Sequence, residues 1–191
     1  GLVPSGAIQD AVMPHVLRVM SESSPHPARA ASLTCCAILR ASRNAASRKD
    51  AFRRLAQDFG KSGKWQLRLL FVGGICEGVR QQFSHKFFRL FFLDTLVSCF
   101  SDQVANVRRK ACQLLPFVRL VLADPAHSGL LEGVAAAEQR LVKDSDRDVA
   151  EAARRQRGAS ADGDMSVASD GSFDALDEEK ARDEFAVHGE M

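Results

Sequence analysis

The chain has 191 residues, of which 46% are hydrophobic and 26% charged, as is typical of a folded globular protein. Its most apolar stretch, residues 87–100, is shorter than a membrane span and contains Arg89 and Asp94, which excludes a transmembrane helix there. The net charge of +2 is unevenly distributed, because residues 158–191 hold 10 acidic and 2 basic residues, whereas residues 1–157 hold 14 acidic and 24 basic residues. The sequence therefore predicts a basic body followed by an acidic tail.

The cysteine pattern fits neither a disulfide framework nor a zinc site. The number of cysteines is odd, no C-x-x-C pair occurs, and two of them are adjacent. The pattern is typical of buried, reduced thiols in a cytoplasmic or nuclear protein. The five residues are Cys35, Cys36, Cys76, Cys99 and Cys112.

Two helical hairpins are predicted in the first half of the chain. Residues 5–41 contain "SGAIQDAVMPHVLRVM", a helix with a kink expected at Pro14, followed by "HPARAASLTCCAILRAS" as its partner. Residues 47–81 contain "KDAFRRLAQDF", a turn at "GKSGK", and a second helix at "KWQLRLLFVGGICEGV". Strand signals are weak throughout, since Tyr is absent and no alternating run of β-branched residues is bounded by turn residues.

Gly73 and Gly74 lie in the middle of this last helix, where each costs about 1 kcal/mol relative to Ala. The apolar periodicity nevertheless continues through Ile75, Cys76 and Val79. We therefore expect a neighbouring helix to pack closely against the bare backbone at the two glycines.

A third hairpin is predicted over residues 83–123. Its first helix, residues 84–100, is apolar on nearly all sides, and Asp102 is placed to cap or turn the chain after it. Its second helix has apolar residues at steps of three and four, and a kink or break is expected at Pro116. The stripe consists of Val104, Val107, Ala111, Leu114, Leu115, Val118 and Leu122.

The fourth hairpin, residues 128–157, reveals an internal repeat. Asp102 and Val107 recur at one common offset as Asp144 and Val149, and a nearly equal step back from Val107 reaches Leu67. A period of about 40 residues with two helices in each unit is typical of HEAT and armadillo arrays. We predict an all-α HEAT-repeat α-solenoid of about four helical hairpins over residues 1–157, as the C-terminal part of a longer array.

The acidic tail, residues 158–191, lacks the apolar content needed to offset the entropy of ordering. It is predicted to be disordered and solvated, with at most a transient helix over residues 173–187. The opposite charges of tail and body would also allow the tail to fold back.

No motif for catalysis, a metal or a cofactor is found. The histidines have no metal-binding spacing, and no phosphate-binding loop or nucleophile elbow occurs. Asp144, Asp146 and Asp148 are similar to the start of a calcium loop but lack its Gly and distal Glu, so capping and turn roles are expected. The chain is predicted not to be an enzyme.

Nucleic-acid binding is the main alternative that composition leaves open. Basic runs occur at residues 108–110 and 154–157, and such runs can contact phosphates. No aromatic residues are interleaved with them, and a charge run on a helix is usually a solvated face. The solvated face is the preferred interpretation.

Three segments resemble HEAT-repeat subunits of serine/threonine protein phosphatases. "FLDTLVSCFSDQVANVRRKACQLLPFV" and "LVKDSDRDVAEAARR" are similar to repeats of the phosphatase 2A scaffold subunit, in which a D-x-V-x-NVR turn joins two helices, and "KWQLRLLFVGGICEGV" is similar to the helix of the preceding repeat. The acidic tail and the loop "ADPAHSG" depart from that scaffold and are closer to a related regulatory subunit of phosphatase 4. The resemblance is best over residues 64–157.

The resemblance implies a non-catalytic scaffold or regulatory subunit that binds a phosphatase catalytic subunit of the 4 or 2A type. In that family the turns within the repeats line the partner-binding ridge. Each of these residues also has a structural role as an alternative to partner contact. Asp102 and Asp144 could cap helices, Arg108 could pair with a neighbouring Asp, and Trp65 could be a core residue. An adaptor for nuclear transport or chromatin is a further alternative. The residues carried over are Lys64, Trp65, Arg68, Asp102, Asn106, Arg108, Asp144 and Asp148.

Overall fold

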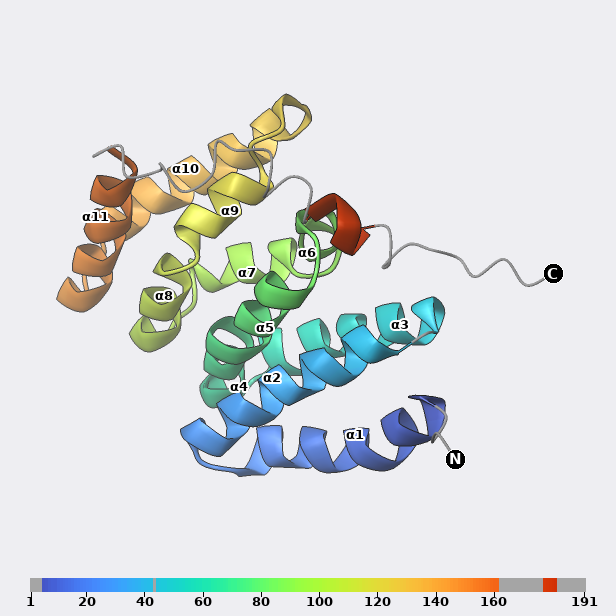
Figure 1. Ribbon diagram of the computed structural model, residues 1–191. Helices are drawn as coiled ribbons and strands as arrows, with labels where there is room; N and C mark the ends of the chain where they lie inside the picture. Colours follow the sequence, from blue (N-terminus) through green and yellow to red (C-terminus); the bar gives the residue numbers. More distant parts are fainter. Residues whose placement is uncertain (1–4, 43, 162–176, 182–191) are drawn as a thin grey trace.

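The computed structural model describes residues 5–42, 44–161 and 177–181 (Figure 1). Every regular element within these ranges is a helix, which confirms the all-α prediction and is consistent with an α-solenoid. None of the helices in this part of the chain has both the length and the apolar composition needed to cross a membrane.

The helices follow one another in four pairs. The first pair consists of α1 (Ser5–Glu22) and α2 (Pro25–Ala41). In the second pair, the first helix is α3 (Ala45–Leu55) with the π-helical turn η1 (Ala56–Gly60), and the second helix is α4 (Trp65–Leu70), the π-helical turn η2 (Phe71–Ile75) and α5 (Cys76–Gln82). In the third pair, the first helix is α6 (His85–Phe91) and α7 (Leu93–Cys99), and the second is α8 (Ala105–Cys112) and α9 (Leu115–Val121). The 3₁₀ turn η3 (Pro125–His127) leads to the fourth pair, α10 (Ser128–Val142) and α11 (Arg147–Ala161).

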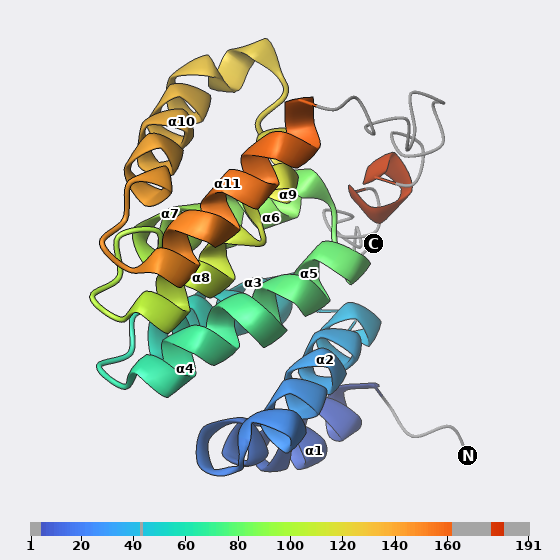
Figure 2. The same ribbon diagram turned by 90° about the vertical axis from the view of Figure 1, so that its left-hand side faces the viewer.

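The second helices of the four pairs form one layer. Figure 2 shows α2, the continuous α4–η2–α5 helix, α8 and α11 side by side in this order, and each packs on the next. The first helices of the pairs form the layer behind. In such an arrangement each pair contacts mainly its neighbours, and a single core runs along the array.

Two of the predicted long helices are interrupted. Pro116 lies in the first turn of α9, and the helix before it ends at Cys112, because proline lacks the N–H that would continue the helical ladder. The helix predicted over residues 84–100 is divided at Phe92, whose backbone φ of −125° is not helical. Pro14, by contrast, lies inside an unbroken α1.

An aromatic cluster joins the second pair to the third. The ring of Phe52 on α3 makes edge-to-face contacts with Phe83, Phe87 and Phe92, at centroid distances of 4.9, 5.1 and 5.3 Å. All four side chains are buried. Since edge-to-face contacts add to the stabilisation from buried apolar area, this cluster is expected to contribute strongly to the core.

The predicted close approach at the glycines is confirmed. A Cβ atom on Gly74 would collide with the Ser32 hydroxyl of α2, and one on Gly78 would lie 2.8 Å from the Cys36 sulfur. The helix remains continuous through this region but widens into the π-helical turn η2. Gly74 and Gly78 therefore lower the helix propensity of this segment but allow its backbone to pack tightly against α2.

All five cysteines are buried and form no disulfide, as predicted. Burial raises the pKa of the Cys35 thiol and of the Cys99 thiol to about 12, and that of the Cys112 thiol to about 11. Burial also raises the pKa of Cys36 and Cys76. The thiols are therefore protonated and shielded in the folded chain.

We expect these thiols to resist modification. At pH 8 a thiol with a pKa of about 12 is deprotonated in roughly one molecule in ten thousand, so the nucleophilic form is scarce. Fewer than one thiol per folded chain should react with Ellman's reagent within minutes, against all five in guanidinium chloride. Several native thiols reacting as fast as the denatured ones would contradict the buried arrangement.

A short acidic helix, residues 177–181, lies against the body. The Asp177 carboxylate accepts a hydrogen bond from the backbone N–H of His85 at 2.8 Å, and Arg40 donates to the carbonyl of Lys180 at 3.4 Å. This helix falls inside residues 173–187, the part of the tail where the sequence allowed a transient helix, and the disorder of the rest of the tail stays a prediction. The first N–H groups of a helix have no acceptor within it, so a carboxylate at the start of α6 is favourable, which is the physical reason for the contact. The remaining tail, residues 162–176 and 182–191, lies outside the described residues.

Candidate partner-binding edge

Three turns line one edge of the array, and we call residues 61–64, 100–104 and 143–146 the turn edge. In each turn a side-chain oxygen accepts a hydrogen bond from the backbone N–H two residues later, which fixes the direction of the following helix. The pairs are Ser62 with Lys64 at 3.2 Å, Asp102 with Val104 at 2.8 Å, and Asp144 with Asp146 at 2.9 Å. The three turns are therefore equivalent positions of a repeat.

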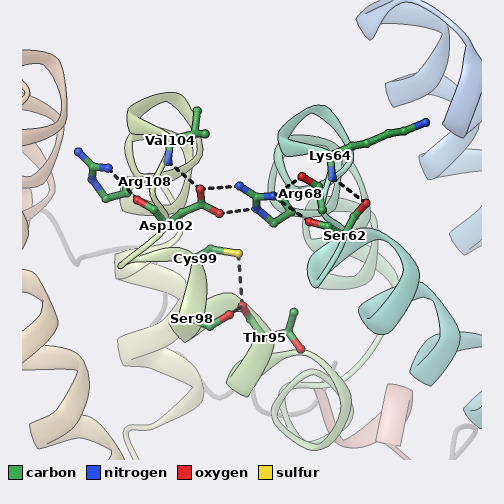
Figure 3. A network of polar contacts seen from close by, with 10 residues as sticks. Ser62, Lys64, Arg68, Thr95, Ser98, Cys99, Asp102, Val104 and Arg108 are labelled. Carbon is green, nitrogen blue, oxygen red and sulfur yellow. Dashed lines mark hydrogen bonds and ion pairs between the residues drawn. The ribbon is translucent and has the colours of Figure 1, made fainter.

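Arginine–carboxylate pairs connect successive turns, and Figure 3 shows the first of them. Arg68 donates from Nε and Nη2 to the two oxygens of Asp102, at 2.5 and 2.8 Å. Arg108 donates in the same way to Asp144, at 2.7 and 2.8 Å. We call these two bidentate pairs the Arg–Asp ladder; such paired bonds fix orientation as well as distance.

Each ladder arginine also holds its own turn. The third nitrogen of Arg68, Nη1, donates to the carbonyl of Ser62 at 2.8 Å, and that of Arg108 donates to the carbonyl of Asp102 at 2.7 Å. One guanidinium thus joins the backbone of one turn to the carboxylate of the next. The ladder therefore sets the spacing between neighbouring repeats at the turn edge.

The ladder has two steps among the described residues, and the sequence explains both of its ends. Ser62, in the place of Asp102, has no carboxylate to accept from a preceding arginine. Ala150 follows Arg108 at the same offset that relates Asp102 to Asp144, and it has no guanidinium.

The ladder side chains are largely shielded from water. The exposed fractions are 11% for Arg68 and 7% for Asp102, and 15% for Arg108 and 10% for Asp144. The hydrogen bonds from Arg108 lower the pKa of the Asp144 carboxyl, against an opposing effect of burial. At Asp102 burial alone would raise the carboxyl pKa, but hydrogen bonds from Arg68 and from the Val104 N–H bring it below its ordinary value.

These shifts predict acid sensitivity. A carboxyl whose pKa is lower in the folded than in the unfolded state stabilises the fold fully above its unfolded value of about 3.9, and this contribution is lost as the pH falls through the folded pKa. The urea midpoint should therefore fall steeply as the pH is lowered from 5 to 3. The Asp144→Asn variant should show a shallower fall; an unchanged slope would contradict a role for this carboxylate.

A second, weaker pairing lies beside the ladder. Arg109 and Asp148 are 3.9 Å apart and their side chains are 50% and 70% exposed, so their interaction is strongly screened. Asp146 caps α11 by accepting hydrogen bonds from the N–H groups of Asp148 and Val149, at 3.0 and 3.2 Å. The predicted capping and turn roles are thus observed for Asp144 and Asp146, whereas the Asp148 carboxylate lies outside the turn and is exposed to solvent.

The eight predicted site residues fall into two groups. Arg68, Asp102, Arg108 and Asp144 are joined to one another in the ladder. Lys64 lies in the turn edge, and Trp65, Asn106 and Asp148 lie beside it in the first turns of α4, α8 and α11; all four are exposed. Trp65 is 38% exposed, so it is not a core residue.

Ser62 and Arg109 are additional residues of this edge that the sequence reasoning missed. One repeat step back from Asp102 would have identified Ser62. The D-x-V-x-NVR pattern identifies Arg108, which is paired, and assigns no role to Arg109, which is exposed.

The chain was compared with known proteins. It is 34% identical, over 122 residues, to serine/threonine-protein phosphatase 4 regulatory subunit 4 of mouse and to the human protein of the same name. In each case the match covers 63% of this chain, and the chain spans only 14% of the length of these curated relatives. No family model matches the chain, and no solved structure matches it. The sequence similarity relates this chain to that regulatory subunit, as the motif resemblance predicted.

Proposed function

We propose, from the relationship to a phosphatase 4 regulatory subunit, that this chain is part of a non-catalytic subunit that binds a serine/threonine phosphatase catalytic subunit along its turn edge. The Arg–Asp ladder is the observation that supports this proposal most, because it holds consecutive turns at a fixed spacing. A surface that is rigid before binding loses little conformational entropy on association. In this proposal the catalytic subunit hydrolyses the phosphate ester, and this chain positions the catalytic subunit.

The two groups of edge residues have different roles in this proposal. The ladder arginines and aspartates space the turns. The exposed residues contact the catalytic subunit, with Trp65 as an apolar anchor and Lys64 and Asp148 as charged contacts at opposite ends of the edge. Aromatic anchors surrounded by polar residues are typical of the centres of protein interfaces.

The nucleic-acid alternative is weakened by the geometry of the ladder. Arg108, the first residue of the basic run 108–110, uses all three guanidinium nitrogens on Asp102 and Asp144. It is therefore not available to a phosphate. The sequence relationship supports a phosphatase partner over a transport or chromatin adaptor.

A co-precipitation with purified catalytic subunits tests the proposal. The 191-residue chain should retain the phosphatase 4 or phosphatase 2A catalytic subunit. The double variant Lys64→Glu, Asp148→Lys should reduce recovery at least tenfold, because it reverses both charged contacts and leaves the ladder intact.

The matched control reverses two exposed charges on first helices, away from the edge. Arg54→Glu, Glu132→Lys should bind like the parent chain, and circular dichroism should show that both double variants keep the same helical content. The proposal is wrong if the parent chain retains neither catalytic subunit, or if the two double variants lose binding equally.

A further inference from the structure

A second candidate surface lies on the layer of second helices, and it shares Trp65 and Arg109 with the turn edge. A cavity of about 440 Å³ opens between α2, α4 and α8. Its walls are mainly aliphatic, with Met20, Leu69 and Leu70 among them, and Trp65 stands at its side. Such a volume accommodates one or two side chains rather than a folded domain.

Three cationic side chains from two helices line the same cavity. Arg29 comes from α2, and Arg109 and Lys110 come from α8. Among the described residues, none of those that line it is acidic. An apolar pocket bordered by cations of one sign favours an occupant that is apolar in one part and anionic beside it.

The positive charges are poorly neutralised within the described part of the chain. The Arg29 guanidinium makes no hydrogen bond or ion pair there, and the Lys110 ammonium donates only to the neutral side chain of Gln113, at 2.6 Å. Arg109 has only the distant, exposed Asp148. The cations also affect one another, because burial in the first place and then the charges of Arg29 and Arg109 lower the pKa of Lys110.

The acidic group that acts on two of these cations already has hydrogen-bond partners of its own. Glu77 on α5 acts on both Lys110 and Arg29 through its charge. Its carboxylate, however, accepts hydrogen bonds from Arg80 at 2.8 Å and from Gln81 at 3.0 Å. The cationic rim of the cavity therefore retains a capacity to bind a further anion.

Gly73 shapes the cavity. Unlike Gly74 and Gly78, which pack against α2, it lies against the side chain of Lys110 on α8. A Cβ atom at this position would lie 2.8 Å from Cε of Lys110, and 3.5 and 3.6 Å from its Cγ and Cδ. The aliphatic part of the lysine therefore lies across the bare backbone of η2. This holds the ammonium group at the border of the cavity instead of extended into solvent.

We propose that this cavity binds a linear acidic segment of a partner protein, in which one bulky apolar side chain is flanked by Asp or Glu. The apolar side chain enters between Trp65, Leu69 and Leu70, and the flanking carboxylates pair with Arg29, Arg109 and Lys110. A single-stranded nucleic acid fits less well, because Trp65 is the only aromatic residue among the described residues that line the cavity, and stacking of successive bases needs more than one. The proposal does not depend on the binding of a catalytic subunit at the turn edge.

The chain supplies its own probe for the experiment, because Trp65 is its single tryptophan. Its emission in the full 191-residue chain is followed during titration with the peptide acetyl-Glu-Asp-Glu-Phe-Glu-Asp-Glu-amide, which has no tryptophan. A saturable change is expected, and it should weaken when the salt concentration is raised. A peptide with Ser in place of Phe, and one with Gln in place of every acidic residue, should each bind at least tenfold more weakly.

Variants locate the binding. Arg29→Glu and Lys110→Glu, separately and together, should weaken the peptide at least tenfold, whereas the control Lys143→Glu, an exposed lysine of the turn edge, should not. Because Arg29 is exposed, its variant tests the site even if the Lys110 variant unfolds. Absence of saturable binding, or equal weakening by the control, would overturn the proposal.

Two other occupants are distinguished by the same signal. Tighter binding of a thymidine dodecanucleotide than of the acidic peptide, lost in the Arg29 and Lys110 variants, would replace the peptide with a nucleic acid. An altered Trp65 emission in the full chain carrying Leu176→Ala and Phe185→Ala, with no peptide added, would show that the chain's own tail fills the cavity. Either result would overturn the assignment to a partner segment.

Discussion

Replacing Asp144 with Ala is expected to lower the free energy of unfolding by about 2 kcal/mol, because it leaves the largely shielded guanidinium of Arg108 without its carboxylate. Two charge-assisted hydrogen bonds are lost together, and the turn loses the acceptor for the N–H of Asp146. Chemical denaturation monitored by circular dichroism measures the change. The Asp102→Ala variant should behave similarly, since Arg68 depends on it in the same way.

The neighbouring residue on α8 provides a matched control. Arg109 makes only the exposed 3.9 Å contact with Asp148, so Arg109→Ala should change the free energy of unfolding by less than about 0.5 kcal/mol. A double-mutant cycle on Arg108 and Asp144 should show a coupling of about 1–2 kcal/mol. Equal effects of Asp144→Ala and Arg109→Ala would mean that the ladder does not stabilise the array.

Replacing Phe52 with Ala should have the largest effect of any single substitution considered, about 3–5 kcal/mol. The side chain is completely buried and its ring touches three other phenylalanine rings from the C-terminal end of α5 and from α6 and its end. Its removal leaves a cavity between the second and third pairs of helices. Thermal or urea unfolding of the full chain measures the loss.

Two further variants separate cavity formation from a general sensitivity of the chain. Phe52→Leu keeps most of the volume and should cost less than half as much as Phe52→Ala. Leu90→Ala, on a side chain that is 63% exposed, should be nearly neutral. If Phe52→Ala cost no more than Leu90→Ala, the aromatic cluster would not contribute strongly to the core.

The helices of the body could be predicted from local patterns, because apolar residues at steps of three and four identify a buried helical face without knowledge of its partner. The recurrence of Asp102 at Asp144 likewise identified equivalent turns, since a short acidic side chain after a helix has one favourable local use. Even the alternative that Arg108 pairs with a neighbouring aspartate followed from the repeat, and the structure shows that pair.

The candidate site was less predictable. Arg108 and Arg109 are adjacent and chemically identical, yet one is bonded to two turns and the other is exposed. The repeat indicated Arg108 as the paired residue, but the exposure of Arg109 beside the cavity depends on how α8 packs against its neighbours, which local pattern does not specify. The tail helix at 177–181 depends in the same way on an N–H at the start of a helix that is distant in the sequence.

The sequence by itself thus determined the helical class, the period of the repeat and the capping chemistry of the turns, since all three arise from interactions within a few residues or from their recurrence. Only the tertiary structure decided which charges are joined in the ladder, which side chains pack against Gly73 and Gly74, and where a cationic apolar cavity opens. Those features arise where helices from different repeats approach each other. Their geometry depends on how residues of separate repeats pack together, and a local sequence pattern does not specify that packing. The Arg–Asp pairs and the placing of Arg29 and Lys110 at one cavity are examples.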